Sequence, residues 1–270
     1  MRPGPVPPGA AGEAVVGPDE TLDYLSGHFR IYQLRDGHRF STDDVLAAWY
    51  GTTWCATAST ILDLGSGIGS VAMIAAWRLP GARLVTVEAQ AASVALARRS
   101  ATYNGLSGRM DIRLGDFRDE RILAPAERFD LVLGSPPYFP VGSGIEGDHP
   151  QKVACRFELR GDIRDYASAA ARHLAPGGIF ACVFPQPDGQ RQRVLDAAAA
   201  AGLTIVRERP VVVRGGQPPL LGLFVMARST DLPGWFRSKT WTEPPLVIRT
   251  AAGEVHPEYQ AIKLAFGFPP

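Results

Sequence analysis

Short apolar runs alternate with longer stretches of helical pattern from about residue 60 onward. The apolar runs predict buried strands at residues 60–65, 83–88, 110–116, 129–134 and 179–184. The stretches between and after them predict helices at residues 70–79, 91–104, 162–174 and 191–201. Strands separated by helices of this length indicate βαβ units, so the chain is expected to be an α/β protein with a parallel, doubly wound sheet.

The last two apolar runs are connected differently from the earlier ones. Residues 203–213 and 220–228 are joined only by RGGQPP, which is too short to hold a crossover helix. They therefore predict an antiparallel C-terminal hairpin at the edge of the sheet. The result is a mostly parallel, seven-stranded, Rossmann-like sheet, which resembles the class I methyltransferase fold. A dinucleotide dehydrogenase would have a sixth parallel strand in place of the hairpin.

The N-terminal part of the chain is biased toward proline, glycine and alanine. Residues 1–25 are predicted to be a disordered or extended leader, and they lack the basic-then-apolar plan of a secretory signal. The rest, residues 26–270, is expected to form a single domain. Residues 26–58 would be its N-terminal cap segment, with a helix that begins at Thr42 or Asp43.

Composition narrows the class of protein without assigning a function. Hydrophobic residues make up 46% of the chain and charged residues 20%, as in ordinary globular proteins, and no apolar run is long enough to span a membrane. Cys55, Cys155 and Cys182 are scattered and form no CxxC pair, which argues against a disulfide framework or a zinc site and suits a reducing cytoplasm. Because the net charge is only +1, any nucleic-acid surface must be a local patch.

A glycine-rich turn joins the first predicted strand to the helix after it. Its pattern is GxGxG, with an acid two positions before the first glycine: Asp63, Gly65, Ser66, Gly67 and Gly69. Glycines let the backbone turn sharply beside a ligand, and the helix start offers free amide donors. S-adenosylmethionine carries an ammonium and no pyrophosphate, so an acid suits it here. A dinucleotide site, or a tight turn without a ligand, also fits this turn taken alone.

Two further acids lie at strand ends. Glu88 ends the second strand, where a carboxylate is placed to accept both ribose hydroxyls of a nucleoside. Asp116 ends the third strand and is followed by Phe117, so the pair is expected to receive an adenine amino group and pack on its ring. Either acid alone would more often be a helix cap or a solvated carboxylate. Together with the glycine turn they favour a nucleoside-containing methyl donor.

The fourth strand is followed by Ser135, Pro136, Pro137 and Tyr138. The tetrapeptide matches the [DNS]PP[YFW] signature of amino-methyltransferases, although a bare proline-rich loop is its ordinary interpretation. The proline pair restricts the backbone and holds the Pro136 carbonyl in one direction as an acceptor for an amine hydrogen. Ser135 offers a second acceptor, and Tyr138 offers a face on which a base can stack. The predicted reaction is methyl transfer to an exocyclic amino group.

Longer segments resemble the bacterial tRNA(Val) adenine-N6 methyltransferase family, from about residue 28 to 266. They are RFSTDDVLAAW, DLGSGIGS, VE, SPPYF and PPLVIRTAAGEVHPEYQAIKLAF. The resemblance implies that S-adenosylmethionine is held by the turn, Glu88 and Asp116, with Thr42 and Asp43 near its methionine end. It implies an adenine N6 in tRNA as the acceptor. Ser135 stands where these enzymes usually have asparagine, which leaves cytosine N4 open.

An RNA partner requires cations near the site. The candidate phosphate contacts are Arg30, Arg35, His38, Arg39, Arg237 and Lys239. No metal is expected, because the sulfonium is already activated. The remaining alternatives are another RNA adenine as the acceptor, a protein glutamine as the acceptor, and a non-catalytic module that binds the donor or RNA. The sequence does not determine the oligomeric state.

Overall fold

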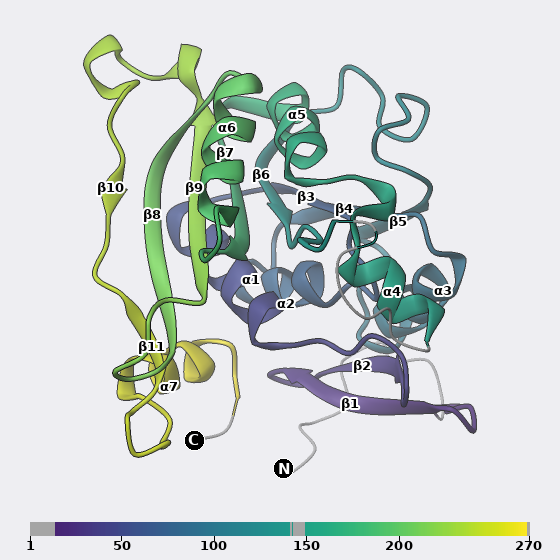
Figure 1. Ribbon diagram of the computed structural model, residues 1–270. Coiled ribbons are helices and arrows are strands. Elements are labelled where there is room, and N and C mark those ends of the chain that lie inside the picture. Colours follow the sequence, from purple (N-terminus) through teal and green to yellow (C-terminus); the bar gives the residue numbers. More distant parts are fainter. Residues whose placement is uncertain (1–13, 141, 143–148, 269–270) are drawn as a thin grey trace.

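A mostly parallel sheet forms the centre of the molecule in the computed structural model, which describes residues 14–140, 142 and 149–268 (Figure 1). Its long strands are β3 (Thr60–Leu64), β4 (Arg83–Glu88), β5 (Met110–Leu114), β6 (Phe129–Gly134), β7 (Leu174–Pro185), β8 (Leu203–Arg214) and β9 (Leu221–Arg228). Their order across the sheet is β8-β9-β7-β6-β3-β4-β5. β9 runs antiparallel to both of its neighbours, so the predicted hairpin is confirmed.

Two short strands extend this sheet beyond the expected seven. β10 (Trp241–Thr242) and β11 (Leu246–Arg249) both pair in parallel with β8 and bring the sheet to nine strands. They belong to the C-terminal tail, which follows the outer edge of β8 and ends in α7 (Pro257–Ala265). The tail therefore covers an edge that would otherwise present unpaired backbone groups.

Helices cover both faces of the sheet. α1 (Thr42–Trp54), α2 (Ser70–Arg78) and α3 (Ala91–Tyr103) pack into one apolar core, and α5 (Ile163–His173) and α6 (Gln190–Ala200) pack into a second core on the opposite face. Ser41 and Asp44 form a capping box that starts α1 at the expected residue. Within the described residues, no helix has the length and apolar character needed to cross a bilayer.

The N-terminal boundary differs from the expected one. Residues 20–25, assigned to the leader, form most of β1 (Glu20–Ser26), which pairs with β2 (Phe29–Leu34) in an antiparallel hairpin. The rest of the predicted disordered or extended leader comprises residues 1–13, which lie outside the described residues, and residues 14–19 before β1. The hairpin packs on α2 and α3 at the bottom of Figure 1, because its apolar face completes their core.

The start of β7 also differs from the start expected from the sequence. Pro176, Gly177 and Gly178 were predicted to end a helix and precede a strand, yet β7 begins directly at Leu174 and runs through them. The ladder between β6 and β7 has an irregularity here, and a Cβ on Gly178 would lie 2.9 Å from the Phe129 carbonyl oxygen. The glycines thus form a bulge where two backbones approach closely.

Parallel pairing of β3 with β6 decides where the loops meet. The sheet order reverses at this point, and Leu64 pairs with Gly134 in the register. The glycine turn (residues 65–69) follows β3, and the SPPY loop (residues 135–138) follows β6. The two consequently emerge side by side at the carboxyl edge of the sheet. Open α/β sheets bind ligands at this kind of reversal.

Asn104 fastens the N-terminal hairpin to α3. Its buried amide accepts from the Arg30 backbone N–H at 2.8 Å and donates to the Arg30 carbonyl at 2.6 Å. We expect Asn104→Ala to lower the free energy of unfolding by about 2–3 kcal/mol, because it removes the partner of two buried backbone groups. Urea denaturation measures this. Ser107→Ala, which removes an exposed hydroxyl, is the control and should change stability by less than about 0.5 kcal/mol; an equal effect would contradict the fastening role.

Candidate active site

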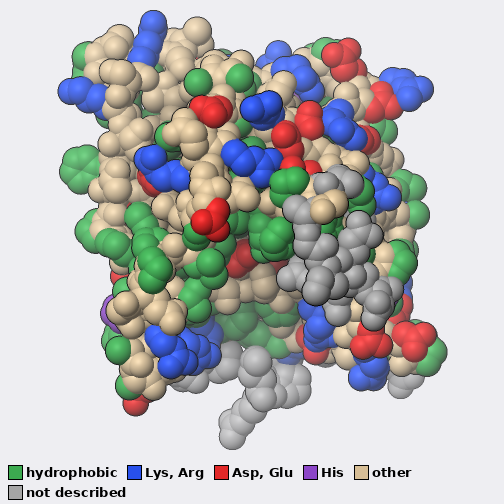
Figure 2. Space-filling model, in the orientation of Figure 1, with side chains coloured by type: hydrophobic (Ala, Val, Ile, Leu, Met, Phe, Trp, Pro, Cys, Tyr) green, Lys and Arg blue, Asp and Glu red, His purple; other side chains and the backbone are tan. Residues whose placement is uncertain are grey.

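The carboxyl ends of β3, β4, β5 and β6 surround one pocket, here called the strand-end pocket. Figure 2 shows a hollow near the centre of this face, with acidic side chains visible inside it. The pocket brings together most of the sequence-predicted residues: His38, Asp43, Asp63, Gly65, Ser66, Gly67, Glu88, Asp116, Phe117, Ser135, Pro136, Pro137 and Tyr138. Gly69 and Thr42 are not among its lining residues.

The glycine turn has left-handed backbone conformations that side chains disfavour. Gly65, Gly67 and Gly69 have φ of +60°, +55° and +83°. A Cβ on Gly67 would meet no atom within 4 Å, so the backbone there is open to a ligand. Gly69 is the N-cap of α2, and a Cβ on it would lie against Met73 and Ala97. Its role is therefore to start the helix close to the protein core.

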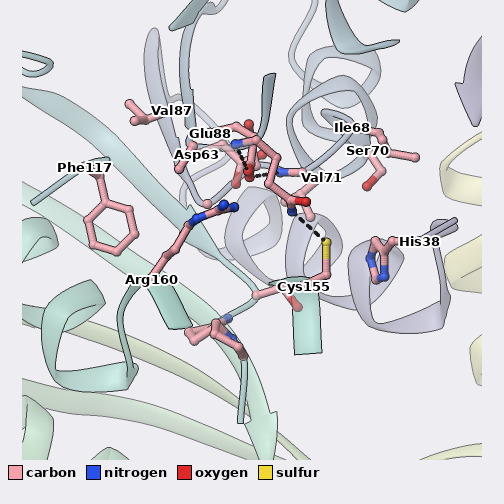
Figure 3. Close-up of a pocket in the computed structure, with 18 of the residues that line it drawn as sticks. His38, Asp63, Ile68, Ser70, Val71, Val87, Glu88, Phe117, Cys155 and Arg160 are labelled. Carbon is pink, nitrogen blue, oxygen red and sulfur yellow. Dashed lines mark hydrogen bonds between the residues drawn. The ribbon is translucent and has the colours of Figure 1, made fainter. Parts of the chain in front are cut away.

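Two of the expected donor-binding acids, Asp63 and Glu88, are held by backbone amides. The Asp63 carboxylate accepts from the Ala72 N–H at 3.1 Å, in the first turn of α2. The Glu88 carboxylate accepts from the N–H groups of Gly67 at 2.9 Å and Gln90 at 2.7 Å. These bonds position both carboxylates in the pocket, where Figure 3 shows them close together.

Asp116 has a partner that the sequence did not indicate. Both oxygens of its carboxylate accept from the Arg118 guanidinium, and this hydrogen bonding lowers the pKa of Asp116. Phe117 is buried and packs edge-on against Tyr166, with ring centroids 4.7 Å apart. The expected contact of Asp116 with an adenine amino group must therefore share a carboxylate already bound to arginine.

Burial, with repulsion between neighbouring carboxylates, raises the pKa values of three acids in this pocket, Asp43, Asp44 and Asp63. Burial, then the neighbouring Asp44 carboxylate, raises the pKa of Asp43 to about 6. Burial raises the pKa of Asp44 to about 6, and burial with the charges of Asp44 and Glu88 raises that of Asp63 well above its usual value. The described lining includes five carboxylates and, among lysines and arginines, only Arg160. Such a pocket favours a cationic ligand.

Residues that follow the SPPY loop in the chain, between 157 and 190, contact it and hold it in place. Phe139 forms a bridge with Phe157, and the Phe139 carbonyl accepts from the Glu158 N–H at 3.0 Å. The Gln190 side chain donates to the Tyr138 carbonyl at 3.4 Å, and the Tyr138 ring packs against Phe184. These contacts hold the loop after β6 against the pocket.

Tyr166 lies between the two loops and was not singled out in the sequence. A Cβ on Gly65 would lie 1.9 Å from its hydroxyl, and one on Gly134 would lie 2.8 Å from its ring. Both glycines therefore make room for this buried ring, which lines the pocket. The available signal was the apolar stripe of the predicted helix, in which Ile163, Tyr166 and Ala170 share one face.

Other unpredicted lining residues come from α4 (Pro150–Arg156) and the 3₁₀ turn Glu158–Arg160. Figure 3 shows Cys155 and Arg160 pointing into the pocket from these elements. The Gln90 side chain donates to the Cys155 sulfur at 3.4 Å. The buried Gln151 accepts from the His38 N–H at 3.0 Å and donates to the Ser93 hydroxyl at 2.9 Å, which fastens α4 beside the pocket.

The candidate phosphate contacts do not form one group. Arg30 is buried, donates to the Phe29 carbonyl and stacks on Tyr24. The Arg39 guanidinium pairs with Asp23 at 2.8 Å, and Arg35 donates to the Pro18 carbonyl. Only His38 among the six lines the pocket.

Arg237 and Lys239 lie at the other end of the sheet. The Thr204 hydroxyl, at the start of β8, donates to the Arg237 carbonyl at 3.0 Å, and this loop is at the top of Figure 1. The pocket opens at the ends of the strands, so these cations are separated from it by the length of the sheet. The sequence could not show this, because a loop's position along the chain does not reveal which edge it occupies.

The comparisons with known proteins agree with this geometry. Residues 53–200 match the methyltransferase small domain. The chain belongs to this family. It is an S-adenosylmethionine-dependent methyltransferase, and the acidic pocket with an open glycine backbone suits the positive charge of that donor. Within the described ranges, no group of three or more His, Cys, Asp or Glu residues is arranged to hold a metal ion.

Individual relatives have different acceptors. The chain is 30% identical over 207 residues to the tRNA1(Val) (adenine(37)-N6)-methyltransferase of Phocaeicola vulgatus, covering 75% of this chain and 82% of that protein. It is 36% identical over 130 residues to the 4-amino-L-phenylalanine/4-methylamino-L-phenylalanine methyltransferase of Streptomyces pristinaespiralis, covering 46% and 43%. A solved structure described as a predicted O-methyltransferase of Agrobacterium tumefaciens has a TM-score of 0.63 at 17% identity, covering 84% of this chain and 98% of that one. This last match shows the fold alone.

Donor affinity should depend on pH through the pocket acids. Burial raises the pKa of Asp44 to about 6 and that of Asp63 well above its usual value, and a cationic donor binds better to the ionised forms of these two carboxylates. We therefore expect affinity to rise as pH increases from 5 to 7.5, by about tenfold if one proton must be lost. Titration calorimetry at the two pH values checks this, and proton release near pH 6 should accompany binding. Equal affinity at pH 5 and 7.5 would contradict the electrostatic role.

Proposed function

We propose that this enzyme methylates the exocyclic N6 amino group of an adenine in tRNA, at position 37 of tRNA1(Val). The observation that carries the proposal is the meeting of the SPPY loop and the glycine turn in one pocket. The relatives that cover most of the chain, such as the Phocaeicola vulgatus enzyme, carry this activity in their names. A tRNA substrate would be met in the cytoplasm.

The chain's own residues supply three functions in this proposal. Asp63, Glu88 and the glycine turn bind the donor, which supplies an electrophilic methyl group on a sulfonium. The Pro136 carbonyl and Ser135 orient the amine, whose lone pair is otherwise delocalised into the ring. Tyr138 provides a surface for the base, since base–aromatic stacking contributes about 1–3 kcal/mol. Bringing amine and methyl together in one pocket lowers the entropic part of the barrier.

The acceptor assay separates the proposal from its rivals. The protein is incubated with labelled donor and unmodified tRNA, and the methylated nucleoside is identified by mass spectrometry. N6-methyladenosine at position 37 is the expected product. N4-methylcytidine or another methylated adenine would reassign the base, and label on a protein glutamine would reassign the substrate class. Donor binding without any product would indicate a non-catalytic module.

Tyr138→Ala tests the place of the base. We expect turnover on tRNA to fall by roughly 5- to 150-fold, because a stacking surface worth about 1–3 kcal/mol is lost, while donor affinity stays near wild type. Single-turnover kinetics and donor calorimetry provide the two readouts. Trp235→Ala is the control, since that ring is exposed at the opposite end of the sheet. Equal losses of turnover and donor affinity would mean that Tyr138 belongs to the donor site.

A further inference from the structure

Asp43 differs from the other acids that line the strand-end pocket. Among the described residues its carboxylate accepts no hydrogen bond and forms no ion pair, while its backbone N–H donates to the Ser41 hydroxyl. The other lining carboxylates have donors: Ser41 N–H for Asp44, Ala72 N–H for Asp63, Gly67 and Gln90 N–H for Glu88, and Arg118 for Asp116. A largely buried carboxylate without a hydrogen-bond donor lowers the stability of the fold, and a functional role would explain why such a residue lies here.

A second cavity meets the strand-end pocket at this residue. This apolar groove shares Asp43 and Tyr138 with the pocket and lies over the ends of β7, β8 and β9. Its other lining residues are Thr42, Phe139, Pro185, Pro187, Asp188, Gln190, Val211, Val213, Leu220, Leu221 and Ile248. In Figure 2 hydrophobic side chains gather over the lower ends of β8 and β9 and lead toward the hollow.

The lining of the apolar groove selects the kind of group that enters. The described walls are mainly aliphatic and aromatic, they include two carboxylates, and they include no lysine or arginine. Phosphate is repelled by such walls, whereas an uncharged planar ring gains from burial against them. The groove therefore suits the ring that bears the acceptor amine, with its amino group directed past Tyr138 toward the donor.

We propose that Asp43 accepts the proton that the acceptor amine loses during methyl transfer. This inference rests on the proposed amine-methyltransferase function. The amine nitrogen forms a bond to the methyl carbon, the carbon–sulfur bond breaks with its electron pair on sulfur, and the positive charge passes from sulfur to nitrogen. As this charge develops on nitrogen, one N–H proton moves to the Asp43 carboxylate, leaving a neutral methylated amine and a neutral thioether. Asp43 is thus a catalytic residue at the junction of the two cavities.

The surroundings of Asp43 suit a proton acceptor at neutral pH. The titratable and charged groups that line the two cavities beside it or interact with it electrostatically include His38, Asp44, Asp63, Asp188 and Tyr259, and Tyr259 in turn lies near Arg249. The Arg249 guanidinium is engaged by the Gly253 carbonyl at 2.9 Å. Burial and Asp44 raise the pKa of Asp43 to about 6, so the carboxylate is ionised above that pH and is a stronger base than an ordinary aspartate.

Asp43→Asn tests the assignment, because asparagine keeps the shape and cannot take the proton. We expect the rate of methyl transfer at pH 7.5 to fall by roughly 100-fold or more, with donor affinity within about threefold of wild type. In wild type, single-turnover rates at saturating donor should fall as pH drops through about 6, because protonation removes the acceptor. That acidic limb should be missing in Asp43→Asn. Asp196→Asn, an exposed change on α6, is the matched control and should keep both the rate and the limb.

Each contrary result identifies a different error. An Asp43→Asn variant that keeps the wild-type rate, or keeps the acidic limb, overturns the proposal. A loss of donor affinity as large as the loss of rate would make Asp43 a donor-binding residue and also overturn it. The wild-type product identifies the acceptor separately: if it is a methylated base other than adenine, the proposed tRNA function is corrected while the Asp43 comparison is made on that base.

Discussion

The pairing of β3 with β6 is the constraint on which the rest of the site depends. Leu64 lies opposite Gly134 in this ladder, so two loops separated by about 70 residues of chain leave the sheet together. Tyr166 occupies the space between them, and both flanking glycines are needed because a side chain at Gly65 would collide with its hydroxyl and one at Gly134 with its ring. A shift in this register would move the proline pair away from the glycine turn and dismantle the pocket.

The same arrangement concentrates negative charge in a space that excludes much of the water. Asp43, Asp44 and Asp63 are desolvated by burial, and the Asp44 charge repels the other two carboxylates, which is why the pKa values of all three are raised. A protein that used the pocket only for packing would gain nothing from this cost. A ligand carrying a sulfonium and an ammonium offsets it, so the electrostatics and the family membership point to the same donor.

Tertiary contacts also explain which features sequence reasoning missed. α4 and the hairpin of β1 and β2 are short, and their patterns are not distinctive, so they were not predicted. The Asp116–Arg118 pair and the fastening of α4 by Gln151 depend on side-chain rotamers that no spacing rule specifies. Arg237 and Lys239 were grouped with the N-terminal cations by residue type alone, and the fold separates them.

The sequence by itself determined the order of the central strands and helices from β3 to β9, apart from α4, together with the antiparallel hairpin and the identities of the glycine turn and the SPPY loop. These are local matters, governed by hydrophobic period, link length and the conformations that glycine and proline allow. Only the tertiary structure decided that Asp43 faces two cavities, that Tyr166 separates the loops, and which cations lie near the pocket. Such relations depend on sheet order and packing between distant segments, which the periodicity of one segment does not encode.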